Sequence, residues 1–319
     1  MHPDTQTPLN TLLRIASFPA TPLLRFKGLS KPGVEIFAKA EWYNPSGSVK
    51  FRPALNIVEE GEKSGQLTKS KIIIDASSGN TGVAYAVLGQ LKGYAVELVM
   101  PKNVADERRN AAEKAGAKII FSDPLAGSDG AIILARKRVK ENPEKYFYAD
   151  QYFNEHNWKA HYQTTALEIL WQTQNRITHF VAGLGTTGTF MGTSRRLKAE
   201  HKKIQAISME PEESLHGMEG LKHMATAIVP GIYDPKLADR HLFVDTDAAY
   251  EMQAKLQKQS GLHVGTSAAG ALVAASRIAS EISQGVMVTI LPAGDDTHVQ
   301  AGQKIFEVTD WGAYALGSK

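Results

Sequence analysis

Short apolar runs alternate with longer amphipathic stretches through most of this chain, and no other feature of the sequence constrains the fold as strongly. Such alternation predicts an α/β protein with mainly parallel sheets that helices flank on both faces. The predicted strands are residues 34–40, 71–75, 95–100, 117–121, 146–149, 179–182, 204–209 and 286–291. The predicted helices are residues 51–63, a stretch ending at Leu91, and residues 105–115, 129–140, 157–174, 189–201, 247–259 and 267–282.

The length of the chain, 319 residues, indicates two domains. We expect a smaller domain of residues 46–148 and a larger domain made of residues 1–45 plus 149–319. A short amphipathic run, residues 9–16, precedes the alternation. Residues 211–240 lack periodicity and contain several prolines, which indicates a long functional loop or lid.

Composition excludes several classes of function. Cysteine is absent, which rules out disulfides, thiolate zinc sites and a thiol nucleophile. The net charge is only +3 and no long basic block occurs, so neither nucleic acid nor an acidic membrane surface is expected as a partner. No apolar run has membrane-spanning length and no export pattern opens the chain, which favours a cytoplasmic protein. The ten histidines lack flanking carboxylates at ligand spacing, so no metal site is expected.

Lys50 follows a run of residues that favours a tight turn, Asn44-Pro45-Ser46-Gly47-Ser48-Val49, and it precedes the predicted helix 51–63. A lysine held at the base of such a helix can be partly desolvated. Desolvation lowers the pKa of the amine and frees it for Schiff-base chemistry. A solvated surface lysine is the commoner case for any lysine taken alone, so this interpretation depends on the rest of the chain.

A first glycine-rich turn, between a predicted strand and a predicted helix, offers an anion site. Its glycines let the backbone approach a ligand, and the first amides of the helix lack acceptors. The hydroxyls and amides could hold a substrate carboxylate, while Asn80 could donate to a cofactor oxygen. An N-capped tight turn would explain the same residues. The turn consists of Ser77, Ser78, Gly79, Asn80, Thr81 and Gly82.

A second glycine-rich turn, again between a strand and a helix, could enclose a phosphate with amides and hydroxyls. It consists of Gly183, Leu184, Gly185, Thr186, Thr187, Gly188 and Thr189. Its three glycines also satisfy G-x-G-x-x-G, and Glu210 stands where a ribose-binding acid is expected, so an NAD(P)-dependent Rossmann enzyme is an alternative. The threonines suit a compact terminal phosphate better, and the alternative leaves the lysine turn and the first glycine-rich turn unexplained.

A Schiff-base lysine, a phosphate cup and a carboxylate turn together describe a pyridoxal-phosphate site. With these motifs in this order, the chain resembles the cysteine synthase family of fold-type II pyridoxal-phosphate enzymes, and within it the B-type O-acetylserine sulfhydrylases. The resemblance implies a fold like that of the tryptophan synthase β subunit. The segments that carry it are Asn44–Lys50, Ser78–Gly82, Asp150–Gln151, Arg176–Val181, Gly185–Thr189 and Pro230–Ile232.

The resemblance also implies roles for individual residues. Lys50 would bind pyridoxal 5′-phosphate covalently and act as the general base, Asn80 would hydrogen-bond the ring oxygen, and Gly185–Thr189 would hold the phosphate. Residues 77–81 and Gln151 would bind the substrate carboxylate. Ser267 would face the pyridine nitrogen, where a neutral hydroxyl makes the cofactor a weaker electron sink and favours expulsion of a β-substituent. An ordinary helix N-cap is the alternative for Ser267.

The activity implied is β-replacement on O-acetylserine or O-phosphoserine by sulfide or thiosulfate. The product would be L-cysteine or S-sulfocysteine, made by a homodimer in amino-acid biosynthesis. Cystathionine β-synthase-like, cyanoalanine synthase-like and serine dehydratase-like reactions are the alternatives within the class, and a degenerate binding module lies outside it. Phe51 and residues 294–300 depart from the family's pattern and bear on substrate and dimer contacts. We also hypothesise that Lys222, His216 and His223 meet an anionic leaving group or co-substrate.

Overall fold

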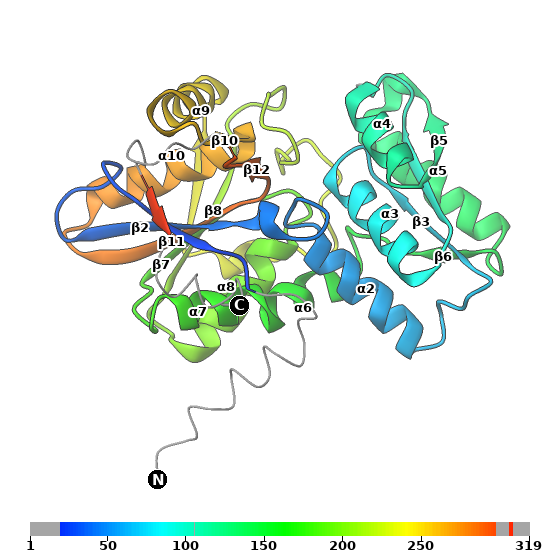
Figure 1. Ribbon diagram of the computed structural model, residues 1–319, viewed down its shortest axis with the longest axis horizontal. Helices are drawn as coiled ribbons and strands as arrows, with labels where there is room; N and C mark the ends of the chain where they lie inside the picture. The colour runs from blue at the N-terminus through cyan, green and yellow to red at the C-terminus, as the bar shows by residue number, and fades with distance from the viewer. Residues whose placement is uncertain (1–19, 105, 298–305, 309–319) are drawn as a thin grey trace, which may run out of the picture.

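The structure is a computed structural model that describes residues 20–104, 106–297 and 306–308. The chain forms two lobes, each built around its own sheet (Figure 1). In the smaller lobe the strand order is β5-β4-β3-β6, and neighbouring strands are parallel. These strands are β3 (Ile72–Ala76), β4 (Val96–Pro101), β5 (Lys118–Ser122) and β6 (Tyr146–Tyr148).

The larger lobe contains a seven-stranded sheet of order β13-β1-β2-β11-β7-β8-β9. β1 pairs antiparallel with both β13 and β2, and the strands from β2 to β9 are parallel to one another. These strands are β1 (Leu23–Phe26), β2 (Val34–Ala40), β7 (His179–Gly183), β8 (Gln205–Pro211), β9 (Arg240–Val244), β11 (Gly285–Leu291) and β13 (Phe306–Val308). A short pair, β10 (His263–Val264) and β12 (Gly294–Asp295), lies apart from it.

Helices cover both faces of each sheet, as the alternation of the sequence predicts. In β2, Ile36 and Ala38 pack toward α9 and α10, whereas Phe37 packs toward α7 and α8, because successive side chains of a strand point to opposite faces. In the smaller lobe, α2 and α3 cover one face and α5 the other. The helices are α2 (Phe51–Lys63), α3 (Asn80–Lys92), α4 (Asp106–Lys114), α5 (Gly127–Glu141), α6 (His156–Gln163), α7 (Thr165–Gln172), α8 (Gly188–Glu200), α9 (Thr246–Ser260) and α10 (Thr266–Glu281), with 3₁₀ turns η1 (Glu41–Tyr43), η2 (Pro124–Ala126) and η3 (Pro235–Leu237).

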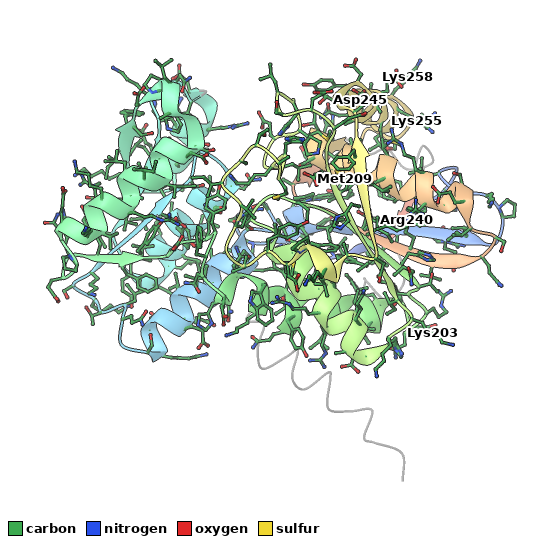
Figure 2. All side chains as sticks on the ribbon, turned by 180° about the vertical axis from the view of Figure 1, so that it is seen from behind. Lys203, Met209, Arg240, Asp245, Lys255 and Lys258 are labelled. Carbon is green, nitrogen blue, oxygen red and sulfur yellow. The ribbon has the colours of Figure 1, made fainter. Side chains whose placement is uncertain are left out.

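The parallel strands point their carboxyl ends toward the boundary between the lobes. Lys203, which precedes β8, and Met209, near its carboxyl end, lie at opposite ends of that strand (Figure 2). β7 leads at its carboxyl end into the second glycine-rich turn, and β3 leads into the first. In open parallel sheets, ligands bind outside the carboxyl ends of the strands, so both turns occupy the place where a ligand site is expected.

The structure differs from the sequence-based expectation in a few elements. The helix predicted at 157–174 is interrupted at Thr164, whose φ of −123° and ψ of −74° lie outside the helical region, although its amide still donates to the Ala160 carbonyl at 3.0 Å. β9 begins at the end of the predicted loop 211–240 and was missed, as was β1. The amphipathic run 9–16 lies outside the described residues. The smaller sheet uses only residues 72–148, but the proposed domain boundaries stay a prediction.

Candidate active site

Two adjoining cavities lie between the lobes and bring the predicted motifs together. The first, about 290 Å³, extends from Lys50 to Ser267 and to the second glycine-rich turn, residues 183–189, which is called the phosphate turn below. The second, about 570 Å³, extends from Lys50 to the turn of residues 77–81 and Gln151. Both are lined by Lys50, Asn80, Gly185, Thr186, Glu219, Gly220 and Leu221. The three motifs, far apart in the sequence, therefore face two adjoining cavities that share part of their lining.

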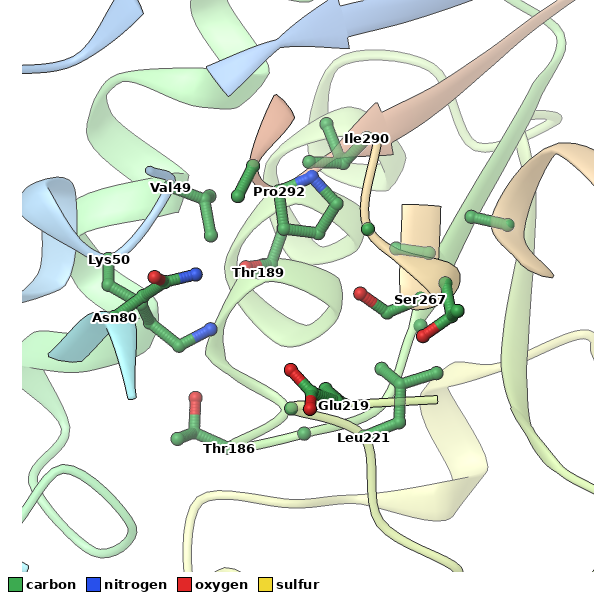
Figure 3. Close-up of a pocket in the computed structure, with 18 of the residues that line it drawn as sticks. Val49, Lys50, Asn80, Thr186, Thr189, Glu219, Leu221, Ser267, Ile290 and Pro292 are labelled. Atoms are coloured by element: carbon green, nitrogen blue, oxygen red, sulfur yellow. The ribbon is translucent and has the colours of Figure 1, made fainter. Parts of the chain in front are cut away.

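Lys50 lies at the N-terminal end of α2, where the backbone around it is tied to the larger lobe. The Val49 amide donates to the Pro292 carbonyl at 2.8 Å, and Ser48 forms an isolated bridge with Ala293. The Lys50 side chain extends into the first cavity (Figure 3). Burial lowers the pKa of this amine to about 8, with no carboxylate acting to raise it again. Its amine is therefore closer to neutrality than that of an ordinary lysine.

The phosphate turn has the donors that an anion needs. Thr187 adopts a left-handed backbone conformation with φ of 69° just before α8 begins, and its Oγ1 is buried without a hydrogen-bond partner among the described residues. Because Thr187 also lines the first cavity, this hydroxyl is available to a group bound there. Together with the free amides at the start of α8, this hydroxyl fits a phosphate group.

Close packing explains the glycines of this turn. A Cβ atom at Gly185 would collide with the backbone carbonyl of Gly220, and one at Gly188 would collide with the side chain of Asn157. Asn157 is itself buried, and its Nδ2 donates to the Gln151 carbonyl at 2.6 Å and to Thr186 Oγ1 at 3.2 Å. The turn is therefore held against both the segment that contains Gly220 and helix α6.

In the carboxylate turn, which is the first glycine-rich turn (residues 77–82), two side chains form hydrogen bonds that hold the turn in place. Ser77 Oγ accepts the Gly82 amide at 2.9 Å, and Thr81 donates to Gln151 Oε1 at 2.7 Å. Gln151 is buried and also donates from Nε2 to the Ala76 carbonyl at 2.8 Å. Hence Ser77 holds the N-terminal turn of α3, whose N-cap is Gly79, and Gln151 braces the turn. Residues 77–81 and Gln151 all line the second cavity.

Ser267 lies across the first cavity from Lys50 and Asn80 (Figure 3). The N-cap of α10 is Gly265, and Ser267 is the second residue of the helix. The alternative interpretation of Ser267 as an N-cap is therefore wrong. Apolar side chains, among them Val49, Ile290 and Pro292, form part of the wall between these polar ends. This combination suits a flat ring with polar groups at its edges.

His161 supports the phosphate turn, a role that the sequence analysis does not assign to it. It is buried on α6, with Nδ1 2.9 Å from Thr165 Oγ1 and Nε2 3.3 Å from Thr189 Oγ1. Burial, together with the positive charges of Arg52 and Lys50, lowers its pKa well below the usual range, so the ring is neutral. His161 and Asn157 were missed because their roles depend on the packing of α6 against α8, which no local motif encodes.

Loop 211–240 contributes charged groups to the second cavity. Lys222 is only 8 % exposed, and its Nζ lies 3.9 Å from Asp129 Oδ1 and 5.0 Å from the centre of the Tyr152 ring. Glu219 forms an ion pair with Arg108 of α4. Both pairs join the larger lobe to the smaller one. His216 and His223 do not belong to the lining of either cavity.

Among the positions that depart from the family's pattern, the described ones, Phe51 and residues 294–297, do not line either cavity. Phe51 is buried in the core of the smaller lobe. Gly294 and Asp295 form β12, and Asp296 accepts a hydrogen bond from the Tyr43 hydroxyl at 2.8 Å. Residues 298–300 lie outside the described part of the chain.

The dinucleotide alternative depends on Glu210, which is not available for a ribose. Its Oε2 accepts the Met224 amide at 2.8 Å, the side chain is buried, and it lines neither cavity. Within the described residues, no group of three or more histidine or carboxylate side chains is placed to hold a metal ion. None of the described helices combines the length and apolarity that crossing a bilayer requires.

Comparisons with known proteins agree with this geometry. The profile of the family described as "Pyridoxal-phosphate dependent enzyme" matches residues 17–293. A cysteine synthase of Aquifex aeolicus is 47% identical over 287 residues, 88% of each chain, and cysteine synthase B of Salmonella typhimurium is 37% identical over 283 residues, 88% of this chain and 92% of the relative. O-acetylserine sulfhydrylase isoform 3 of Entamoeba histolytica superposes with a TM-score of 0.81 at 30% identity, covering 95% of this chain and 93% of that one. The O-acetylserine-dependent cystathionine β-synthase of Helicobacter pylori gives the same TM-score at 30% identity, covering 95% and 99%.

Proposed function

The chain belongs to the pyridoxal-phosphate-dependent enzymes and, among them, to the cysteine synthase family, and from this premise we propose that it catalyses β-replacement on an O-activated L-serine. The observation that carries the proposal is that the Lys50 amine and the threonine-lined phosphate turn share one cavity, with the carboxylate turn in the cavity next to it. The substrate would be O-acetylserine or O-phosphoserine, and the nucleophile sulfide or thiosulfate.

The residues of the first cavity suit pyridoxal 5′-phosphate. Lys50 would hold it covalently, and Gly185–Thr189 with the N-terminus of α8 would bind its phosphate. Asn80 would donate to the ring oxygen, and the Ser267 hydroxyl would face the ring nitrogen. When bound, the cofactor supplies an electron sink that acidifies the substrate α-proton and allows a β-substituent to leave.

The residues of the second cavity would bind and orient the amino acid. The backbone amides around Ser78, Gly79 and Asn80, at the start of α3, would bind its carboxylate. Once displaced by the substrate amine, Lys50 would take the α-proton at its Nζ and return it after the nucleophile has added. Its lowered pKa keeps part of the amine neutral at physiological pH, as a general base requires.

The pKa of Lys50 predicts how the apoenzyme captures its cofactor. Only the neutral amine attacks the aldehyde, so the capture rate should rise with pH and level off above pH 8. An ordinary lysine would continue to gain reactivity up to about pH 10.4. Stopped-flow absorbance of apoenzyme mixed with pyridoxal phosphate from pH 6 to 10 measures this rate, with a free-lysine peptide as control. An inflection near that of the peptide would contradict the proposed burial of the amine.

We further propose that the smaller lobe, residues 46–148, moves to close over the bound carboxylate. The ion pairs Arg108–Glu219 and Lys222–Asp129 span the two lobes beside the second cavity and would make and break as the lobe moves. Closure would keep water away from the reacting carbons. X-ray scattering with and without a substrate carboxylate tests it, since an unchanged radius of gyration would argue against movement.

The position and charge of Lys222 predict which leaving group the enzyme prefers. It is a nearly buried cation at the second cavity, with one carboxylate at the long distance of 3.9 Å, so it can offer charge to an anionic group. We expect Lys222→Ala to lower kcat/KM for O-phosphoserine about tenfold, which corresponds to about 1.4 kcal/mol. The kcat/KM for O-acetylserine should stay within about twofold of the wild-type value.

The measurement is cysteine formation from each activated serine with sulfide, with homocysteine and cyanide as alternative nucleophiles. Failure of the holoenzyme to convert either activated serine would remove the proposed function. If Lys222→Ala leaves kcat/KM unchanged for both activated serines, only the proposed role of this lysine is removed.

We also propose that the enzyme works as a homodimer in the cytoplasm. The support is its likeness to cysteine synthases and the absence of cysteine from the chain, which suits a reducing compartment. Light scattering that gave the mass of one 34.7 kDa chain would contradict the dimer.

A further inference from the structure

A buried cluster of four charged side chains lies behind the lysine turn. Lys39, Glu41, Arg52 and Glu168 come from β2, η1, α2 and α7, and each is at most 9% exposed. The two positive and two negative charges balance. Burial of charge is costly unless every group is paired, so a cluster of this kind is weak evidence for stability, and a geometric role is the hypothesis to test.

Arg52 connects the cluster to the helix that begins next to Lys50. Its guanidinium donates to Glu41 from Nε at 2.7 Å and Nη2 at 2.9 Å, and to Glu168 from Nη1 at 2.5 Å and Nη2 at 2.8 Å. A bidentate contact to each of two carboxylates fixes the plane and the position of the guanidinium. Because Arg52 is only two residues from Lys50, this also fixes the first turn of α2.

Glu41 also holds the other end of the lysine turn. Its Oε2 accepts a 2.8 Å hydrogen bond from Asn44 Nδ2, and the same amide donates to the Glu41 carbonyl at 2.9 Å. The carboxylate of Glu41 therefore contacts residues on both sides of Lys50, Asn44 before it and Arg52 after it. The Lys50 amine itself has no hydrogen bond or ion pair among the described residues, so its position depends on its backbone.

Lys39 provides an internal comparison, because it belongs to the same cluster without contacting the turn. Its Nζ lies 2.8 Å from Glu168 Oε2, and it donates to the Thr21 carbonyl at 2.9 Å and to Gln172 Oε1 at 2.8 Å. Charge balance in the cluster thus depends on Lys39 as much as on Arg52. The geometry of the turn depends on Arg52 and Glu41.

We infer that Arg52 and Glu41 are positioning residues, which clamp the two ends of the Asn44–Arg52 segment so that the Lys50 amine meets the cofactor at a fixed position. This inference rests on the proposed function and deepens it. A displacement of about 1 Å at a reacting group can cost about 10²-fold in rate, so the clamp has a measurable effect on catalysis that is separate from stability.

The test compares Arg52→Lys with Lys39→Gln in the holoenzyme. Arg52→Lys keeps every charge but loses the bidentate fork, whereas Lys39→Gln loses a charge and keeps the fork. We expect both to lower the thermal midpoint. Only Arg52→Lys should weaken the visible circular dichroism per bound cofactor, lower the yield of borohydride-trapped cofactor on Lys50, and reduce kcat by about 10²-fold with little change in KM.

The inference is overturned if Arg52→Lys retains the wild-type dichroism and kcat, or if Lys39→Gln shows the same losses per folded molecule. Should Arg52→Lys fail to fold, Asn44→Ala provides the test, because it removes only the contacts to Glu41 at the N-terminal end of the Asn44–Arg52 segment. A wild-type spectrum and a wild-type kcat in that variant overturn the inference. Absence of trapped cofactor on Lys50 in the wild-type enzyme would instead remove the proposed function.

Discussion

Replacing Lys50 with alanine is expected to abolish the visible absorbance of the cofactor-loaded enzyme and to lower turnover by at least about 10³-fold. The variant loses the amine that would hold the cofactor covalently and the base that would move the α-proton, and a general base alone contributes about 10²- to 10⁴-fold. The fold should survive, because this amine makes no hydrogen bond or ion pair within the described residues. Absorbance spectra, cysteine formation and thermal melting measure the three outcomes.

Lys137→Ala is a suitable control for that experiment. Lys137 is an exposed lysine of α5, with 67% of its side chain accessible, and it lies outside both cavities. It should keep the absorbance, the turnover and the melting temperature of the wild type. Turnover near the wild-type rate in Lys50→Ala would end the proposed mechanism, whereas a variant that loses activity only because it unfolds would be recognised by its melting curve.

Replacing Gly185 with alanine is expected to weaken cofactor binding about 30-fold. The new Cβ would collide with the backbone carbonyl of Gly220, which cannot rotate away as a side chain could, so the phosphate turn must shift. Overpacking of this kind costs about 2 kcal/mol, which corresponds to about that loss in affinity. Titration of the apoenzyme with pyridoxal 5′-phosphate, followed by absorbance, gives the dissociation constant.

Pyridoxal without its phosphate is the matched control for Gly185→Ala. If the turn binds the phosphate, the wild type should prefer pyridoxal phosphate strongly over pyridoxal, and the variant should lose affinity mainly for the phosphorylated form. An equal loss for both ligands would show that the turn does not bind the phosphate, and that the substitution acts by distorting the whole cavity.

The sequence predicted much of the fold because strand and helix periodicity is a local property. The strands around residues 72–76, 96–101 and 285–291 differ from the prediction by one residue at their ends. Elements without a local signal were missed: among the described strands β9 lies at the edge of its sheet and pairs with β8, and the helix break is a departure of the single residue Thr164 from helical backbone angles. In both cases neighbouring segments of the fold decide the conformation, and periodicity cannot report them.

The three motifs, read in order, were enough to indicate the class of cofactor, since the reactive or binding groups of each motif lie within a few residues of Lys50, Asn80 or Gly185. They did not indicate what holds those residues in place. Glu168 reaches Arg52 across 116 residues of chain, and His161 reaches Thr189 across 28. The identity of the chemical groups was thus determined by the sequence. Their alignment was decided only by the tertiary structure, because contacts between residues far apart in the sequence exist only once those segments have packed together.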